Sequence, residues 1–476
     1  MLMKSLVAAL CLPLMLPHLS LAAEKRTAPQ QKISIFTVSP ELLYGLWRVD
    51  RFYGGPNMQR GPVTQRSFLL GNLGGIRDEW ADKGFIFNTN ITQFLNSNVK
   101  GGSRHGILRY DGSSDYLMAW DSGKAGVWSV GAVILHGETS WRARHSINPD
   151  VGSLLPANFD ATMPVLNQSE TTLSEAYFLQ ALPYNFIVLA GKINFAGLAD
   201  QNVFANNENS QFDYTGLVNN PSLGAFIPYT PLGAGLVWVS GDKHHTVALV
   251  AADKDGAANK TGFNTVFNGQ STYGGQYQYT TSFKGNPGNY RILAGYTTKG
   301  PVSFSIDRRH LLAEIIGLVP VEHKSNNYGV MANFDQYLWT FSSQETDKLG
   351  KPLAANGRIA LPPLGIGVFA RASWAPDDRN VIDQFYSAGI GGYGLWFANR
   401  PLDNWGIGYA YTHISNKLRK LLRPIRLKNN EHGTEVFYNY AIIPSVKLTL
   451  NGQAIRSPVE RRKTAYTAGG RLRVML

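Results

Sequence analysis

The segment YGGQYQYTTSF, residues 273–283, alternates between two kinds of side chain. Tyr277 and Tyr279 fall on one face of an extended chain, and Gln276 and Gln278 fall on the other. Successive side chains of a β-strand point to opposite faces, so a period of two predicts a strand with one apolar and one polar face. Such a strand lies at a boundary between an apolar environment and water.

The same alternation predicts sixteen strands along the chain. They span residues 84–97, 105–121, 126–137, 173–182, 185–193, 233–240, 245–253, 273–283, 289–299, 327–341, 365–375, 385–398, 404–414, 432–443, 445–455 and 464–476. Residues 301–306 also alternate and are assigned to a loop. Short turns mostly alternate with long connections such as 138–172 and 194–232. An even number of strands, with short turns at one end and long loops at the other, is typical of a bacterial outer-membrane barrel. The long connection 342–364 is the main exception.

The polar faces of these strands indicate what the barrel would enclose. They carry mostly Gly, Asn, Gln, Ser and Thr, with few charged residues, many of them arginine. This composition fits a water-filled lumen, whereas the aromatic faces fit lipid and its interfaces. The predicted fold is an all-β, transmembrane antiparallel β-barrel of 16 strands with short N-terminal periplasmic helices. A secreted β-sandwich stays open, because alternation does not show which face is inside.

The first residues predict export. Lys4 precedes an apolar run that ends at Leu21, which is typical of a secretory signal peptide at residues 1–22. The single cysteine, Cys11, lies in that run, so the mature chain has no disulfide and no thiolate metal site. No later stretch has the roughly 18 uninterrupted apolar residues of a membrane helix, which excludes a helical membrane protein.

Residues 23–83 are expected to form a periplasmic lead-in to a barrel domain at 84–476. One short helix is predicted to begin at Ser39, with proline at its first helical position. A second is predicted over residues 73–83, ended by a glycine. Neither helix is long enough to form a domain.

The formal net charge of +12 constrains the partners of an exported protein. It favours anionic outer-membrane lipid and lipopolysaccharide phosphates over nucleic acid, for which no motif is present. A basic run falls in a predicted outer loop: Lys417, Arg419, Lys420, Arg423, Arg426 and Lys428. This run is either a solvated loop or a contact for lipopolysaccharide.

Several stretches resemble the carbohydrate-selective porins of the OprB type. LGNLGGIRDEWADKGFIF, residues 70–87, is similar to the Gly-Asp-Trp-Gly-Gly-x-Arg signature of that family, with matches at Gly74, Gly75 and Arg77. The usual Asp-Trp pair is replaced by Asn-Leu. The stretches AYFLQALPYNFIVLAGKINF, GVFARASWAPDDRNVIDQFYSAGIGGYGLWFANRPLDNWGIGYAY and EVFYNYAIIPSVKLTLNGQAIRSP extend the resemblance to the end of the chain. Residues 200–330 match least.

The resemblance implies a sixteen-stranded outer-membrane barrel with an internal constriction that passes mono- and oligosaccharides passively, without catalysis or a cofactor. Hydrogen-bonding side chains, planar guanidinium groups and aromatic surfaces favour such neutral, polyhydroxylated solutes. Strand parity predicts seven charged lumen residues: Arg109, Arg291, Arg371, Glu435, Lys447, Arg471 and Arg473. Glu175 and Lys192 join them from strands whose faces the pattern does not assign. Each could instead be a paired wall charge, and an excess of cations would favour anions over sugars.

An enzymatic alternative comes from YTHISN, residues 411–416, which resembles a stretch of outer-membrane phospholipase A. His413 and Ser415 are two residues apart, so they would share a strand face, and a nucleophilic serine needs such a base. However, Lys417 replaces the glycine of that family, and its second sequence block is missing.

Two further pairs suggest metal chemistry only weakly. His244 and His245 are predicted in a solvated turn without a third ligand. Asp377 and Asp378 follow a proline in a predicted outer loop, where turn chemistry accounts for them, although such a pair can hold Ca²⁺. The sequence therefore predicts no metal site.

The last predicted strand, residues 464–476, would close the barrel against the first. Leu472 and Val474 are expected to face lipid. Arg471 and Arg473, which alternate with them, are expected to face the lumen. Leu476 would stand in place of the phenylalanine by which the barrel-assembly machinery usually recognises the last strand. Lipid-facing and subunit-facing aromatics look alike, so a monomer and a homotrimer are both compatible with the sequence.

Overall fold

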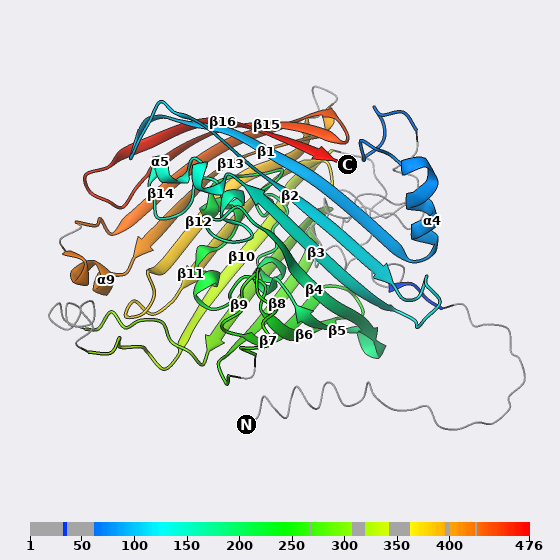
Figure 1. The fold of residues 1–476 in the computed structure, drawn as a ribbon, viewed down its shortest axis with the longest axis horizontal. Coiled ribbons are helices and arrows are strands. Elements are labelled where there is room, and N and C mark those ends of the chain that lie inside the picture. Colours follow the sequence, from blue (N-terminus) through cyan, green and yellow to red (C-terminus); the bar gives the residue numbers. More distant parts are fainter. Residues whose placement is uncertain are drawn as a thin grey trace, which may run out of the picture.

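The computed structural model describes residues 32–35, 61–266, 268–306, 319–341, 362–395, 400–423 and 426–476. Within these residues the chain forms one closed antiparallel barrel of sixteen strands (Figure 1). The strands are β1 (Phe85–Gly102), β2 (Leu108–Asp121), β3 (Gly131–Trp141), β4 (Thr171–Leu182), β5 (Phe186–Lys192), β6 (Leu232–Val239), β7 (His245–Asp253), β8 (Ser271–Phe283), β9 (Asn286–Thr297), β10 (Asn327–Thr340), β11 (Gly365–Trp374), β12 (Ile382–Leu395), β13 (Arg400–Ile414), β14 (Asn430–Ile443), β15 (Val446–Arg456) and β16 (Lys463–Met475).

The barrel confirms the predicted fold class. Each strand pairs with its neighbours in sequence, and β1 pairs with β16 to close the sheet. Each of the sixteen predicted strands corresponds to one observed strand, with ends that differ by a few residues. Residues 301–306 contain only one isolated bridge, between Val302 and His323. Most of the connection 342–364, the signal peptide and the helix predicted at Ser39 lie outside the described residues.

The alternation of the sequence appears as two faces of one wall. On β8 and β9, Tyr277 pairs with Ile292, and these outward side chains are 41% and 58% exposed. The next pair along, Gln278 and Arg291, points inward. A continuous outward surface of exposed tyrosine, leucine, isoleucine and valine is unfavourable in water and matches the lipid-facing band of an outer-membrane barrel. No helix in the described part of the chain is long and apolar enough to cross a membrane.

The helix predicted at residues 73–83 is present as η3 (Leu73–Gly75) and α4 (Ile76–Asp82). It lies beside the barrel end at which β16 finishes (Figure 1). Gly84 ends this segment with a φ of +86°, and a Cβ at this position would overlap the main-chain oxygen of Asp121. Glycine is therefore required where the chain turns from the helix into β1.

Arg77 of α4 links the lead-in to the last strand. Its Nη2 donates to the main-chain oxygen of Leu476 at 2.5 Å. The guanidinium carbon lies 4.2 Å from the centroid of the Phe68 ring and 4.8 Å from that of Phe87. Burial lowers the pKa of Arg77 to about 10, so the side chain stays charged at neutral pH. Arg77 thus holds the end of β16 against the start of β1.

Arg77→Met is expected to lower the free energy of unfolding by about 2 kcal/mol, the usual size of a hydrogen bond to a charged group. Urea unfolding followed by tryptophan fluorescence measures this loss, and heat-modifiable gel mobility shows whether the barrel has formed. Lys83→Met is the control, because Lys83 only makes an exposed ion pair with Glu79 on the same helix. Equal unfolding midpoints for the two variants would contradict the role of Arg77.

Candidate functional site

Two long connections fold into the barrel and occupy much of its lumen. Loop 142–170 joins β3 to β4, and loop 193–231 joins β5 to β6; in Figure 1 they form the teal and green segments between the strands. They contain short helical turns: η4 (Ala143–His145), α5 (Asn148–Val151), η5 (Asp160–Thr162), α6 (Phe195–Ala199), α7 (Thr215–Val218) and η7 (Pro221–Ala225). Both loops therefore lie inside the barrel and against its inner wall.

Loop 193–231 packs against the inner wall through buried apolar side chains. Phe204, Phe212, Tyr214 and Leu217 join one hydrophobic cluster with inward residues of β10 to β16, including Phe369. At the other side of the lumen, Phe195, Phe226 and Ile227 join a second cluster with inward residues of β2 to β7. The loop therefore bridges the lumen between two parts of the wall.

Inward glycines make room for this loop. A Cβ at Gly433 of β14 would overlap the ring of Tyr214, and a Cβ at Gly408 of β13 would lie 2.7 Å from Leu217 Cδ2. Side chains at these positions would push the loop away from the wall. The glycine-rich strands near the end of the sequence are therefore explained by the loop that lies on them.

Arg371 of β11 anchors loop 193–231 from one side. Its Nε lies 2.9 and 3.1 Å from the two carboxylate oxygens of Asp200. Its Nη atoms donate to the main-chain oxygens of Leu217 at 3.2 Å, Val218 at 3.3 Å and Ala205. The guanidinium is completely buried. A buried pair is stable only when its remaining hydrogen-bond groups are satisfied, and the loop backbone satisfies them here.

Arg471 of β16 forms the equivalent anchor near the barrel seam. It pairs with Asp213, and its Nη atoms donate to the main-chain oxygens of Glu208 and Gln211, both at 2.8 Å. Glu435 of β14 accepts the main-chain N–H groups of Asp213 at 2.8 Å and of Tyr214 at 2.7 Å. These two predicted lumen residues thus lie together under the same segment of the loop.

Glu431 connects the two inserted loops, and the sequence analysis did not identify it. Its carboxylate accepts the N–H groups of Leu154 at 2.5 Å and Leu155 at 2.9 Å, from loop 142–170. It also accepts the hydroxyl of Tyr214 at 3.0 Å, from loop 193–231. Glu431 is four residues before Glu435 on the same strand, so the period of two places both side chains on the inward face. That spacing was the sequence signal that could have identified Glu431. No sequence signal identified the loop residues that it contacts.

The other predicted lumen residues are spread around the wall. Arg109 of β2 makes two hydrogen bonds, of 2.5 and 2.9 Å, to the carboxylate of Asp150 in loop 142–170. Arg291 of β9 lies 2.8 Å from Asp335 of β10, within the wall itself. The remaining inward arginine, Arg473, is buried on β16.

The two lysines and Glu175 have different surroundings. Lys447 of β15 donates to the main-chain oxygen of Leu402 at 3.2 Å. Lys192 of β5 donates to the main-chain oxygens of Leu173 and Ala258. Glu175 of β4 is buried and lies 3.0 Å from the imidazole of His136. Glu175 also accepts the main-chain N–H of Asn194, at the start of loop 193–231, at 3.1 Å.

A family model described as the carbohydrate-selective porin, OprB family, matches residues 87–476. The chain belongs to the OprB family. It is therefore an outer-membrane porin, a channel by family and by fold. A search of curated proteins found no match.

Solved porin structures resemble this OprB-family chain. The high-pH structure of OprB from Pseudomonas putida is 17% identical, with a TM-score of 0.70, and covers 86% of this chain and 98% of its own. The low-pH structure of the same protein is 15% identical, with the same coverage and a TM-score of 0.49. The channel DcaP of Acinetobacter baumannii is 12% identical over 82% of this chain and 97% of its own, with a TM-score of 0.45. The first of these matches supports the fold.

The residues of the enzymatic alternative do not form a catalytic pair. β13 ends at Ile414, so Ser415 is not on the strand face of His413 as expected; instead it caps α9 (Asn416–Leu421). Its hydroxyl donates to the main-chain oxygen of Asp377 and accepts the N–H of Leu418 at 3.1 Å. The serine proton is therefore not directed at His413, which lies 2.6 Å from Asp383.

The two weaker metal candidates have ordinary partners. His244 Nδ1 lies 2.8 Å from the main-chain oxygen of Thr280, and His245 Nδ1 lies 2.8 Å from the hydroxyl of Tyr277. Asp378 pairs with Arg379 at 2.7 Å in the turn after β11. That ion pair lowers the pKa of Asp378, chiefly through its hydrogen bond with Arg379.

Gly433→Ala is expected to displace loop 193–231 and to raise single-channel conductance, because the added methyl group overlaps Tyr214. Overpacking of this kind costs about 1–3 kcal/mol. Gly452→Ala on β15 is the matched control, since its Cβ would find its nearest neighbour at 3.7 Å. An unchanged conductance in planar bilayers, or the same change in both variants, would show that the loop does not depend on this glycine.

Proposed function

We propose that this porin passes neutral sugars by passive diffusion through the space between its inserted loops and the barrel wall. The observation that carries the proposal is the pairing of the inward arginines. Arg371, Arg471 and Arg109 each face a loop carboxylate, and Arg291 faces a wall carboxylate. The Arg371, Arg471 and Arg291 pairs are each locally neutral, so these three arginines present no net positive field to the solute. Asp150 is shared by Arg109 and the more exposed Arg104.

The inward wall offers neutral hydrogen-bonding groups to such a solute. Gln276, Gln278 and Asn289 occupy partly exposed positions on β8 and β9. Amide groups donate and accept hydrogen bonds, as do sugar hydroxyls, and they carry no charge. Together with the description of the OprB family, this wall supports a preference for sugars over small anions.

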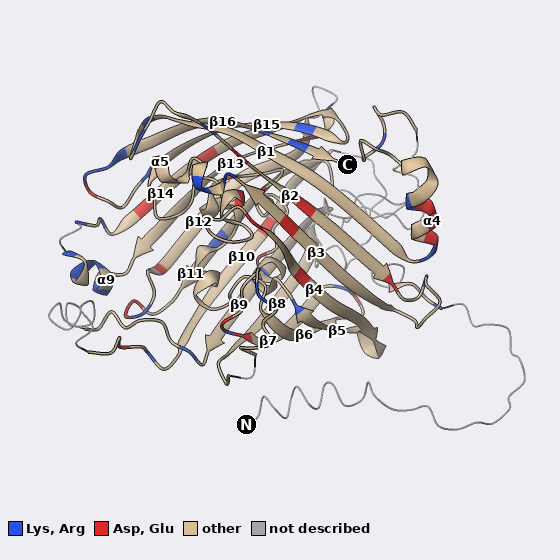
Figure 2. Cartoon of the chain, viewed as in Figure 1, with Lys and Arg blue, Asp and Glu red and all other residues tan. Residues whose placement is uncertain are grey.

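The proposed partners at the membrane follow from the outer surface. α9 and the residues after it carry the basic run that begins at Lys417, and Figure 2 shows Lys and Arg gathered on α9 at one end of the barrel. We infer that this end meets lipopolysaccharide phosphates. We also infer that the barrel-assembly machinery recognises β16 through its apolar outward face, which includes Leu472 and Val474.

Liposomes that contain the purified protein are expected to swell in glucose and more slowly in larger oligosaccharides, while small anions gain no advantage over sugars of similar size. Passive diffusion through a fixed opening predicts this order, because size and hydrogen bonding then govern passage. Swelling rates in isosmotic solutions measure it. Absence of sugar flux, or faster entry of anions, would overturn the proposed selectivity.

Asp200→Asn is expected to shift the channel toward chloride, because Arg371 then loses its carboxylate partner and remains a buried charge. The uncompensated guanidinium also destabilises the loop, since breaking a buried pair costs about 3–5 kcal/mol. Reversal potentials in a KCl gradient measure the shift. Asp378→Asn removes the same charge from an extracellular turn and serves as the matched control. Equal reversal potentials for the two variants would contradict the proposed neutral pairing.

A further inference from the structure

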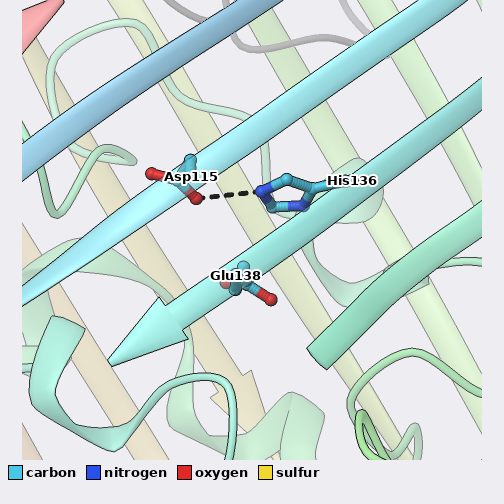
Figure 3. A group of neighbouring side chains, drawn as sticks. All are labelled: Asp115, His136 and Glu138. Atoms are coloured by element: carbon cyan, nitrogen blue, oxygen red, sulfur yellow. Dashed lines mark hydrogen bonds and ion pairs between the residues drawn. The ribbon is translucent and has the colours of Figure 1, made fainter. Parts of the chain in front are cut away.

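Acidic side chains surround one histidine on the inner wall, apart from the loop anchors. His136 of β3 lies 2.9 Å from Asp115 of β2 through Nε2 and 3.0 Å from Glu175 of β4 through Nδ1. Glu138 is two residues further along β3 and therefore points to the same face. The four side chains are buried. Figure 2 shows acidic positions on these three neighbouring strands, and Figure 3 shows His136 directed at Asp115 with Glu138 beside it.

The geometry of this group is close to that of a metal site. Asp115, His136 and Glu138 each offer one ligand atom, and these atoms all lie within 4.8 Å of one another. Ligands bound at about 2.0–2.2 Å from one ion lie at most about 4.4 Å apart. Small rotations of the two carboxylates would therefore bring the three atoms to a common centre.

The charge of the surroundings favours a cation. Asp115, Glu138 and Glu175 are three buried acidic groups around one imidazole. Lys192 interacts electrostatically with both glutamates and so offsets one of these charges, while its ammonium group donates to the main-chain oxygens of Leu173 and Ala258. Buried charges are costly unless they are compensated, and a divalent cation would compensate two of them at once.

A second, independent feature comes from loop 193–231. Asn209 is 5% exposed, and its Nδ2 donates to Asp115 Oδ2 at 3.1 Å. Its Oδ1 is buried and has no hydrogen-bond partner in the described part of the chain. A half-turn of the amide would direct this oxygen at the Asp115 carboxylate, and a cation between them would remove their repulsion. An amide oxygen can complete a coordination shell around a divalent cation, as it commonly does for Ca²⁺.

We propose that Asp115, His136 and Glu138 bind one divalent cation of the Zn²⁺ class, with Asn209 as the fourth ligand. One imidazole nitrogen among oxygen ligands suits zinc and its neighbours in the first transition row, whereas Ca²⁺ and Mg²⁺ prefer oxygen ligands alone. Because Asn209 belongs to loop 193–231, the bound ion fastens that loop to β2 and β3. These strands differ from β11 and β16, which carry the anchors Arg371 and Arg471.

Isothermal titration of the folded, EDTA-treated protein in detergent with ZnCl₂ tests the site. The His244→Gln, His245→Gln double variant is the background, because two adjacent histidines on the surface can bind Zn²⁺ themselves. One equivalent of Zn²⁺ is expected to bind to this background. His136→Gln and Glu138→Gln are each expected to weaken binding by at least about 10-fold, since even residues outside the coordination shell change affinity by that factor. A tenfold excess of CaCl₂ is expected not to displace the ion.

His413→Gln is the matched control, because His413 faces a single carboxylate, Asp383, and is expected to leave binding unchanged. Glu138→Gln keeps the shape of the side chain and an acceptor for the Tyr229 hydroxyl, so it keeps the test valid if His136→Gln does not fold. Heat-modifiable mobility shows which variants have folded. Absence of Zn²⁺ binding in the background, or full affinity in Glu138→Gln, would overturn the proposal.

Discussion

Hydrocarbon provides no partner for main-chain N–H and C=O groups, and this constraint determines the rest of the structure. A spanning strand must find its hydrogen bonds on both neighbours, so the sheet has to close. The pairing of β1 with β16 removes its last open edges. Arg77 and Leu69 of the lead-in add hydrogen bonds to the main-chain oxygens at the end of β16. The lumen exists as a separate compartment because this seam is complete.

Inside that compartment, buried charge pairs act together with two apolar clusters to hold loop 193–231 on the wall. Arg371 and Arg471 hold loop 193–231 from different strands, and each guanidinium donates to loop carbonyls besides its carboxylate partner. Removing one partner from such an arrangement is costly, whereas the complete arrangement is stable. The position of loop 193–231 on the wall is therefore fixed by interactions whose single removal lowers stability.

The alternation of the sequence was informative wherever the two faces of a strand differ. It predicted β4 and β5 as strands but did not assign their faces, because both faces are apolar: Leu189 packs inward against loop 193–231 while Val188 is directed outward. The pairing of β3 with β4 also shifts register between His136 and Gly137. The alternation of inward and outward side chains on β4 therefore changes just before Glu175. Phe369 and Phe437 lie at inward positions of their strands, and they were the sequence signal for an inserted loop. A large apolar side chain that faces a water-filled lumen is expected to be buried by another apolar segment.

The sequence by itself determined the sixteen strands, the closed antiparallel barrel and the inward direction of residues such as Arg371 and Glu435. These features follow from a local period of two and from connection lengths, which are visible in one dimension. Only the tertiary structure decided that Asp200 and Asp213 meet those residues, and that Asp115, His136 and Asn209 come together. Loop residues have no period, and their position is fixed by side-chain packing and charge pairing across long separations in sequence.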